Sequence, residues 1–201
     1  SFGSNNEVTG GVCAVRRHAD ARIRGVKRIQ IEPHLSATAA CSAEWVPIKP
    51  KTDGAFMMAM VHVLLHETPR ASLDLAFLRD RTASPYLVGP DGYYLRDPDS
   101  GKPLMWDEAA GRPVAFDAAG ARPALEGTFT VAKSVSLLAD GEIARHENAA
   151  ARTAFSAMVE AMQQYSPEWA SDVCGVPAAT IRHVAGEYVA NACIGETIEI
   201  E

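Results

Sequence analysis

Val26-Lys-Arg-Ile-Gln-Ile-Glu32 is the stretch that decides the fold class of this chain of 201 residues. Its side chains alternate between two faces, which is typical of a β-strand, and Pro33 ends the pattern. Residues 11–24 directly before it carry apolar side chains at helical spacing, and Gly25 suits the C-terminal cap of such a helix. A helix that leads from a glycine-containing loop into a strand forms most of a βαβ unit. The sequence therefore predicts an α/β fold whose first strand is missing.

The next elements along the chain extend this unit. Residues 44–48 predict a second short strand, and Asp53 is placed to cap the helix that follows. Residues 54–67 are apolar nearly all round, which indicates a helix packed between a sheet and other helices. The methionines of this helix favour core packing over a soft-metal site. Another short helix is expected at 72–81.

Residues 83–146 have a different character. Turn clusters such as Gly89-Pro-Asp-Gly92 and Asp117-Ala-Ala-Gly120 separate short apolar runs. The stretch is too long for a simple connection, so we expect an irregular insertion with short hairpins between residues 1–82 and residues 147–201.

Residues 147–201 are expected to return to the first domain as helices and to end in a strand. The first helix is predicted at about 147–164, which makes Glu142, His146 and Glu147 part of a helix start. Ser166-Pro-Glu168 and Pro177 predict the starts of two more helices. The alternating pattern of residues 196–201 predicts the closing strand.

Composition excludes several classes of protein. Nineteen Lys and Arg against 25 Asp and Glu give a formal net charge of −6, so a generally basic nucleic-acid binder is not expected. The longest apolar stretch, residues 55–65, is shorter than the roughly 20 residues that a bilayer requires. The four cysteines form no CxxC motif, so we expect buried thiols and no metal site built from this chain alone. The compartment, cytoplasmic or periplasmic, stays open.

Three loops at the carboxyl ends of predicted strands form a candidate ligand site, because open α/β sheets bind ligands there. Gly3-Ser4-Asn5 precedes a helix, where glycine permits close backbone approach and amide groups favour a phosphate. Glu32 can accept hydrogen bonds from both hydroxyls of a ribose, and Asp53 can accept from the N1–H and the amine of guanine. The alternatives are a simple turn at Gly3, a solvated strand end at Glu32 and a helix cap at Asp53. Neither a GxGxxG nor a GxxxxGK[ST] motif occurs.

Two further clusters have a simpler interpretation. His62 and His66 stand four residues apart, but Val63 replaces the Glu of an HExxH motif, so one packed and one surface histidine are expected. The basic residues between Arg16 and Arg28 are expected to form a solvated helix face and strand margin, with phosphate attraction as the alternative.

Several segments resemble the molybdopterin oxidoreductase family, the dimethyl sulfoxide reductase superfamily. Its catalytic subunits carry a Gly-x-Asn loop, a strand ending near Asp-Pro-Arg and an Ala-Asp-x-Trp-x-Pro-Ile-x-Pro-Gly-Thr-Asp run, in that order. The corresponding segments here are Phe2-Gly-Ser-Asn5, Ile31-Glu-Pro-His34 and Ala43-Glu-Trp-Val-Pro-Ile-Lys-Pro-Lys-Thr-Asp53-Gly-Ala-Phe56. Residues 165–169, 173–182 and 194–198 also resemble the family, so the likeness covers nearly the whole chain.

The resemblance implies a Rossmann-like three-layer parallel sheet that holds one guanosine diphosphate arm of bis(molybdopterin guanine dinucleotide). It implies that Gly3, Ser4 and Asn5 meet the pyrophosphate region. It further implies that Glu32, His34 and Ser36 meet ribose or phosphate. Lys51, Thr52 and Asp53 would surround the guanine.

Two positions depart from the family pattern. His34 stands where Arg is usual, which weakens a fixed charge on phosphate. Lys51 stands where Gly is usual. Either the backbone angle at Lys51 is less special than in relatives, or the lysine supplies its own contact.

The resemblance also implies the parent protein, a bacterial molybdenum or tungsten oxidoreductase in which electrons leave through iron–sulfur centres. In the family, the metal ligand and the iron–sulfur cysteines lie upstream of such a segment. We therefore expect this chain to be a fragment with no catalytic residue, no metal ligand and no redox activity of its own. Three partners are expected: the molybdopterin cofactor, the rest of the catalytic subunit and an iron–sulfur electron-transfer subunit. The alternatives are a non-catalytic domain that senses guanine or adenine nucleotides, and a lobe at 85–146 that contacts a partner subunit.

Overall fold

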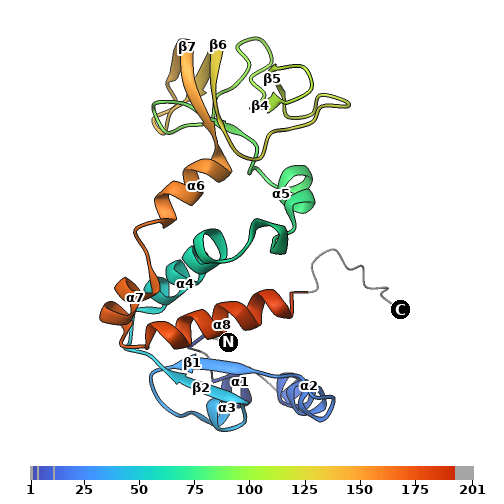
Figure 1. Cartoon of the computed structure of the whole chain (residues 1–201). Coiled ribbons are helices and arrows are strands. Elements are labelled where there is room, and N and C mark those ends of the chain that lie inside the picture. Colours follow the sequence, from blue (N-terminus) through green and yellow to red (C-terminus); the bar gives the residue numbers. More distant parts are fainter. Residues whose placement is uncertain (1, 4, 11, 193–201) are drawn as a thin grey trace. The chain divides into compact units, whose positions relative to one another are not determined.

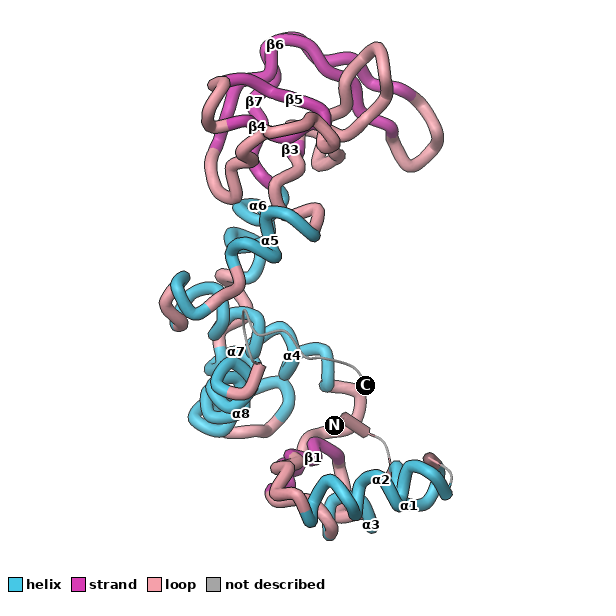
Figure 2. The backbone as a smooth tube through the Cα atoms, turned by 90° about the vertical axis from the view of Figure 1, so that its right-hand side faces the viewer, coloured by secondary structure: helices cyan, strands magenta, loops and turns pink. Residues whose placement is uncertain are grey.

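The computed structural model describes residues 2–3, 5–10 and 12–192 of the chain and shows an α/β protein (Figure 1), which confirms the predicted class. These residues divide into two compact units, one formed by 2–68 with 162–192 and the other by 69–161. Helices predominate in the first unit and strands in the second (Figure 2). None of the helices in these ranges is long and apolar enough to span a membrane.

The first unit begins with two helices, α1 (Asn6–Thr9) and α2 (Val12–Ile23), and strand β1 (Ile29–Glu32). Helix α2 ends as the sequence predicts, since Gly25 has a φ of +87°. The Gly25 N–H donates to the Arg22 carbonyl at 2.9 Å, and the Val26 N–H donates to the Ala21 carbonyl at 3.0 Å. This pair of bonds is a Schellman motif, which satisfies two carbonyls that the helix leaves open. The strand itself starts later than the pattern predicts, at Ile29.

A parallel sheet follows. Strand β2 (Glu44–Pro47) pairs with β1 in parallel, with Ile31 opposite Val46 and Glu32 opposite Pro47, and the short helix α3 (Ala37–Ala40) lies in the connection. Phe2 forms a parallel bridge to Ile31. Because Ile31 already pairs with β2 on one side, the bridge places Phe2 on the other side of β1.

Helix α4 (Asp53–His62) continues directly into a π-helical turn, η1 (Val63–Glu67). Phe56 and Ala59 are completely buried, whereas Met57 and Met58 are 46% and 39% exposed. The expectation that the methionines of this helix pack in the core is therefore wrong for Met57 and Met58. One face of α4 packs in a core shared with α7, α8 and the sheet, and another face carries the exposed methionines. His62 is buried and His66 exposed, as expected.

Two later helices complete the first unit. Helix α7 (Pro167–Cys174) starts after Ser166, whose Oγ accepts a hydrogen bond from the Trp169 N–H at 3.2 Å. Helix α8 (Ala178–Ala190) starts after Pro177, so both predicted starts are confirmed. Side chains from the sheet and from α4, α7 and α8 share one core, which contains Ile31, Val46, Ile48, Phe56, Ala170 and Ile181. Burial of each large apolar side chain contributes about 1.5–3 kcal/mol.

The second unit starts with a 3₁₀ turn, η2 (Arg70–Ser72), and helix α5 (Leu75–Arg81). Its strands are β3 (Leu87–Val88), β4 (Leu104–Asp107), β5 (Arg112–Ala115), β6 (Thr128–Leu137) and β7 (Ile143–Thr153), and helix α6 (Ala154–Met162) follows. The strands form an antiparallel sheet in the order β3-β7-β6 and a separate β4-β5 hairpin. A small core of Leu87, Leu95, Leu104, Val131, Ala149 and Ala151 lies within this unit.

The predicted helix at 147–164 is wrong in its first half. Residues 147–153 belong to strand β7, and the helix begins only at Ala154. Val131 pairs with Ala149 and Phe129 with Ala151, so buried alanines alternate with more exposed residues along β7. Alanine has a high helix propensity, but pairing along β6 outweighs this preference. The predicted closing strand at 196–201 lies outside the described residues.

Candidate functional site

The backbone brings the three predicted loops to one edge of the parallel sheet. Glu32 and Pro47 are paired at the ends of β1 and β2. The Gly3 N–H donates to the Ile31 carbonyl at 2.9 Å, so the N-terminal segment lies beside the carboxyl end of β1. The rings of Phe2 and Phe56 pack edge to face with centroids 5.6 Å apart, which joins this segment to α4. The carboxyl ends of parallel strands thus meet where sequence reasoning expects a ligand.

The N-terminal loop combines a left-handed glycine with open space. Gly3 has a φ of +57°, and a Cβ atom added there would meet nothing within 4 Å. Conformation, rather than crowding, therefore explains glycine at this position. Asn5 precedes α1, and its Oδ1 lies 3.0 Å from the Thr38 Oγ1. Ser4 lies outside the described residues.

Glu32 is buried, with 2% of its surface exposed, so the alternative of a solvated strand end is wrong. Its Oε1 accepts from the Ser36 N–H at 3.1 Å, and its Oε2 accepts from the Gln30 Nε2 at 3.2 Å. Burial alone would raise the pKa of Glu32, but the hydrogen bonds from Ser36 and Gln30 and the nearby His34 hold this pKa below its ordinary value. An ionised Glu32 therefore fixes the loop that follows β1.

The other two predicted residues of this loop differ in exposure. Ser36 is buried at the N-cap of α3, where its Oγ accepts from the Ala39 N–H at 3.2 Å. His34 is exposed to solvent. The Trp45 Nε1 donates to the Glu32 carbonyl at 3.1 Å and connects the ends of the two strands. Hydrogen bonds from Ser36 and Trp45 to Glu32 thus fix this loop, and the His34 side chain faces solvent.

Lys51 keeps the backbone angle that glycine would adopt. Its φ is +67°, and its side chain is exposed. The alternative of an ordinary backbone angle is therefore wrong. Thr52 occupies the N-cap position of α4, but its Oγ1 donates to the Lys49 carbonyl at 2.7 Å and does not cap the helix.

Asp53 is half-buried and is the first residue within α4, so the expectation that it caps the helix is also wrong. Among the described residues its carboxylate has no hydrogen-bond or ion-pair partner. The Lys49 N–H donates to the Cys174 carbonyl at 3.0 Å, which attaches this loop to the end of α7. A loop fixed at Lys49 therefore leads to a half-buried carboxylate at the first residue of α4.

Sequence reasoning missed a network that supports the N-terminal loop. The Arg28 Nη2 donates to the Glu7 Oε1 at 2.7 Å and to the Thr38 carbonyl at 3.2 Å, and its Nε donates to the Ser42 Oγ at 3.1 Å. The Thr38 Oγ1 donates to the Glu7 Oε2 at 2.6 Å and also lies next to Asn5. Burial would raise the pKa of Glu7, but Thr38, Arg28 and His18 together lower it.

His18 completes this network. Its Nδ1 lies 2.9 Å from the Arg28 Nη1 and 3.3 Å from the Glu7 Oε1, so the tautomer of the imidazole decides which of the two it bonds. One feature of the sequence could have indicated this network, because Arg28, Gln30 and Glu32 form a polar face on the predicted strand. A solvated strand margin does not describe Arg28, whose side chain is 16% exposed.

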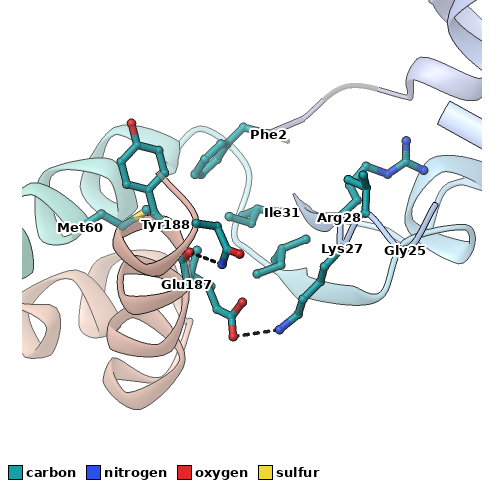
Figure 3. A pocket seen from close by; sticks show the side chains of 12 residues that line it. Phe2, Gly25, Lys27, Arg28, Ile31, Met60, Glu187 and Tyr188 are labelled. Carbon is teal, nitrogen blue, oxygen red and sulfur yellow. Dashed lines mark hydrogen bonds and ion pairs between the residues drawn. The ribbon is translucent and has the colours of Figure 1, made fainter. Parts of the chain in front are cut away.

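A cavity of about 610 Å³ lies along residues 25–31, on the side of β1 where Phe2 pairs (Figure 3). Apolar side chains contribute to its lining, among them Phe2, Ile29, Ile31, Met60, Val184 and Tyr188. The Lys27 Nζ and the Glu187 Oε1 form an ion pair at 3.0 Å beside it. None of the eight predicted site residues that the structure describes lines this cavity, so it is separate from the part of the candidate site that they form. The described ranges also hold no group of three or more His, Cys, Asp or Glu placed to bind a metal ion.

Comparisons with known proteins agree with the motifs at this sheet edge. A sulfite dehydrogenase subunit of Allochromatium vinosum is 33% identical over 178 residues, which cover 82% of this chain and 17% of that protein. The perchlorate reductase alpha subunit of Dechloromonas aromatica is 28% identical over 208 residues, which cover 85% of this chain and 21% of that protein. The chain thus spans only a small part of the length of these relatives. The family model described as "Molybdopterin oxidoreductase" matches residues 1–197, so this chain belongs to the molybdopterin oxidoreductase family.

Proposed function

We propose that this chain is the part of a molybdenum or tungsten oxidoreductase catalytic subunit that anchors the guanosine diphosphate arm of bis(molybdopterin guanine dinucleotide). The observation that supports the proposal is the carboxylate of Asp53, which has no partner within the described ranges and follows β2 at the sheet edge where the left-handed Gly3 and the fixed loop after Glu32 also lie. This set of groups offers acceptors for a base and backbone donors for a phosphate. A polar dinucleotide tail fits such a donor and acceptor set.

Asp53 provides the preference for guanine. A carboxylate can accept two hydrogen bonds, one from the guanine N1–H and one from its exocyclic amine. Adenine presents an acceptor at N1, which would face the carboxylate with like polarity. Thr52 and Lys51 flank this position, and the Lys51 ammonium group supplies a cation beside the nucleotide.

The other predicted residues hold the sugar and the pyrophosphate. The open space at Gly3 lets a phosphate approach the backbone closely, with Ser4 and Asn5 beside it. The Glu32 carboxylate accepts bonds from Ser36 and Gln30 and would offer a remaining lone pair to a ribose hydroxyl. His34 is exposed to solvent, and Ser36 fixes the start of α3. The Phe2 segment, β1 and β2 form the part of a Rossmann-like sheet that this chain contributes.

The cofactor, when bound, supplies the redox-active metal, and the residues of this chain hold its tail in one orientation. In the proposed parent enzyme, the rest of the catalytic subunit, together with an iron–sulfur electron-transfer subunit, completes the path of the electrons. The purified chain alone is expected to show no redox activity.

Thermal unfolding in the presence of nucleotides tests the proposal. A ligand that binds only the native state at 100 times its dissociation constant stabilises it by about 2.7 kcal/mol. GDP should therefore raise the melting temperature of the chain, while ADP and NAD at the same concentration should raise it much less. Equal stabilisation by GDP and ADP would instead support a nucleotide-sensing domain.

Asp53→Asn should abolish the preference for GDP and leave the circular dichroism spectrum unchanged. Asp99→Asn makes the same chemical change on an exposed loop of the second unit and should keep the preference. A folded Asp53→Asn chain that still prefers GDP would overturn the assignment of Asp53 to the base.

A further inference from the structure

Thr38 is a completely buried polar residue at the centre of the network that supports the N-terminal loop. It lies in α3, and its hydroxyl group contacts two residues of the N-terminal segment, Asn5 and Glu7. Because other residues cover Thr38, it cannot touch a ligand itself. Any role of Thr38 in binding must therefore act through a neighbour such as the half-buried Asn5.

The Thr38 hydroxyl has three close neighbours but only one hydrogen. Its Oγ1 accepts from the Glu7 N–H at 3.0 Å, and it lies 2.6 Å from the Glu7 Oε2. A distance of 2.6 Å is typical of a hydroxyl that donates to an ionised carboxylate. Burial raises the pKa of Glu7, but Thr38, Arg28 and His18 lower it by more, so at neutral pH Glu7 is ionised and can only accept. The single hydrogen of the Thr38 hydroxyl therefore lies in the bond to Glu7.

This assignment determines which atom of the Asn5 amide belongs beside Thr38. The third neighbour of the Thr38 Oγ1, at 3.0 Å, is the Asn5 Oδ1, and two acceptors without a hydrogen between them repel each other. A half-turn of the Asn5 amide exchanges its oxygen and its nitrogen and removes this conflict. The Asn5 Nδ2–H then donates to the remaining lone pair of the Thr38 Oγ1. Thr38 thus accepts two hydrogen bonds and donates one, which is the full capacity of a hydroxyl group.

We infer that Thr38 is a positioning residue of the proposed nucleotide site, which holds the Asn5 amide with its nitrogen inward. The Asn5 carbonyl oxygen and its second Nδ2–H are then left for the ligand. This inference rests on the proposed function, in which Asn5 lies beside the pyrophosphate. A side chain that is fixed before binding avoids the ordering cost of a free one, which corresponds to about two- to tenfold in affinity.

NMR of the ¹⁵N-asparagine-labelled chain tests the orientation without a ligand. The sequence has four asparagines, at positions 5, 6, 148 and 191. One Nδ2–H of Asn5 should exchange slowly with water and show a nuclear Overhauser effect to the Thr38 side chain. The exposed Asn148 is the internal control and should exchange fast. An Asn5 Nδ2 group that exchanges as fast as that of Asn148 would refute the inferred orientation.

Titration with GDP tests the role in binding, with guanosine as the ligand that lacks phosphates. Thr38→Val replaces the hydroxyl by a methyl group and should weaken GDP binding about two- to tenfold, while guanosine binding changes by less than about twofold. Thr38→Ser keeps the hydroxyl and should restore GDP binding. Thr9→Val is the matched control and should leave GDP binding unchanged, because the exposed Thr9 Oγ1 bonds the Asn5 backbone carbonyl and not its side chain.

A double-mutant cycle separates positioning from a merely structural role. If Thr38 acts through the Asn5 side chain, Thr38→Val should not weaken GDP binding further in an Asn5→Ala chain. Equal losses in both backgrounds would overturn the inference. If Thr38→Val fails to fold, the exchange of the Asn5 Nδ2–H in the wild-type chain decides.

The same titration distinguishes this inference from the proposed function. A wild-type chain that binds no GDP would contradict the proposed function, and the role of Thr38 would fail with it. A chain that binds GDP equally well with Thr38→Val would contradict the role of Thr38 alone.

Discussion

Glu32 in the first unit and Asp91 in the second are both carboxylates with a lowered pKa, yet they are held in different ways. The hydrogen-bond partners of Glu32, Gln30 and Ser36, lie two and four residues away in sequence. Asp91 accepts from the Tyr93 N–H at 3.0 Å, but its Oδ2 also lies 3.1 Å from the Nε2 of His146. The same His146 Nε2 lies 2.9 Å from the Ser136 Oγ.

The two carboxylates differ in how far along the chain their partners lie. Local partners hold the loop after β1, so this loop needs little beyond its own sequence to take its shape. The turn at Asp91 depends on β6 and β7, which come much later in the chain. The loop after β1 thus relies on short-range contacts and one longer network at Arg28, so substitutions in this loop and at Asp91 test the contrast.

Arg28→Ala should have the largest effect. It leaves the mostly buried Glu7 carboxylate without its cationic partner and should lower the free energy of unfolding by about 3 kcal/mol. Urea unfolding at neutral pH measures this loss. Arg24→Ala removes an exposed arginine from the same region and should change stability by less than about 0.5 kcal/mol. Equal effects of the two substitutions would show that the Arg28 network does not support the loop.

Glu32→Gln should have the second largest effect, about 2 kcal/mol, because hydrogen bonds to an ionised acceptor are replaced by weaker ones. The folded-state pKa of Glu32 is below its unfolded value of about 4.3. Its contribution is therefore complete above the unfolded pKa and is lost as the pH falls through the folded pKa.

Urea unfolding at several pH values checks both parts. The wild-type chain should lose stability below about pH 4.3, and Glu32→Gln should remove part of this dependence. Asp91→Asn should also reduce the loss of stability at low pH. Burial raises the pKa of Asp91, but Tyr93, Ser136 and His146 lower it by more, so the pKa is below its ordinary value. Hydrogen exchange separates the two variants. Glu32→Gln should expose the amides around α3, and Asp91→Asn should expose those of the β6–β7 hairpin.

Lys51→Gly should have the smallest effect and the opposite sign. It removes the strain of the left-handed conformation, which costs a non-glycine residue about 1–2 kcal/mol. Glycine also makes the unfolded chain more flexible, which offsets about 0.4–1 kcal/mol of this gain in stability. The melting temperature should therefore rise slightly. Asn148→Gly is the matched control, because Asn148 also has a positive φ, +49°, and asparagine tolerates this region. A lower melting temperature for Lys51→Gly would indicate that the lysine side chain stabilises the loop.

Sequence patterns were sufficient where structure is local. The strand end at Glu32, the Schellman cap at Gly25 and the serine cap before α7 all depend on residues within one turn of each other. The strand at 147–153 could not be predicted in this way. Its alanines favour a helix by propensity, and only pairing with β6 makes them a strand.

For the candidate site, the sequence alone could name residues but not their interactions. The sequence placed Glu32 and Asp53 at strand ends, but it could not show that Glu32 is buried or that Asp53 lies inside α4. It also missed Arg28, because a basic side chain near other basic residues resembles a solvated surface. Burial depends on α3 and the N-terminal segment, which no local pattern of β1 reveals.

The hydrogen bond between Lys49 and Cys174 joins segments that leave the ribosome at different times. At about 5–20 residues per second, several seconds or more separate their synthesis. Residues 69–161 emerge in this interval and contain a core of their own, so they can fold first. The loop at residues 49–53 gains its support only when α7 is translated. Under the proposed function, insertion of a nucleotide cofactor here belongs to a late stage of biogenesis, after the second half of the chain has been made.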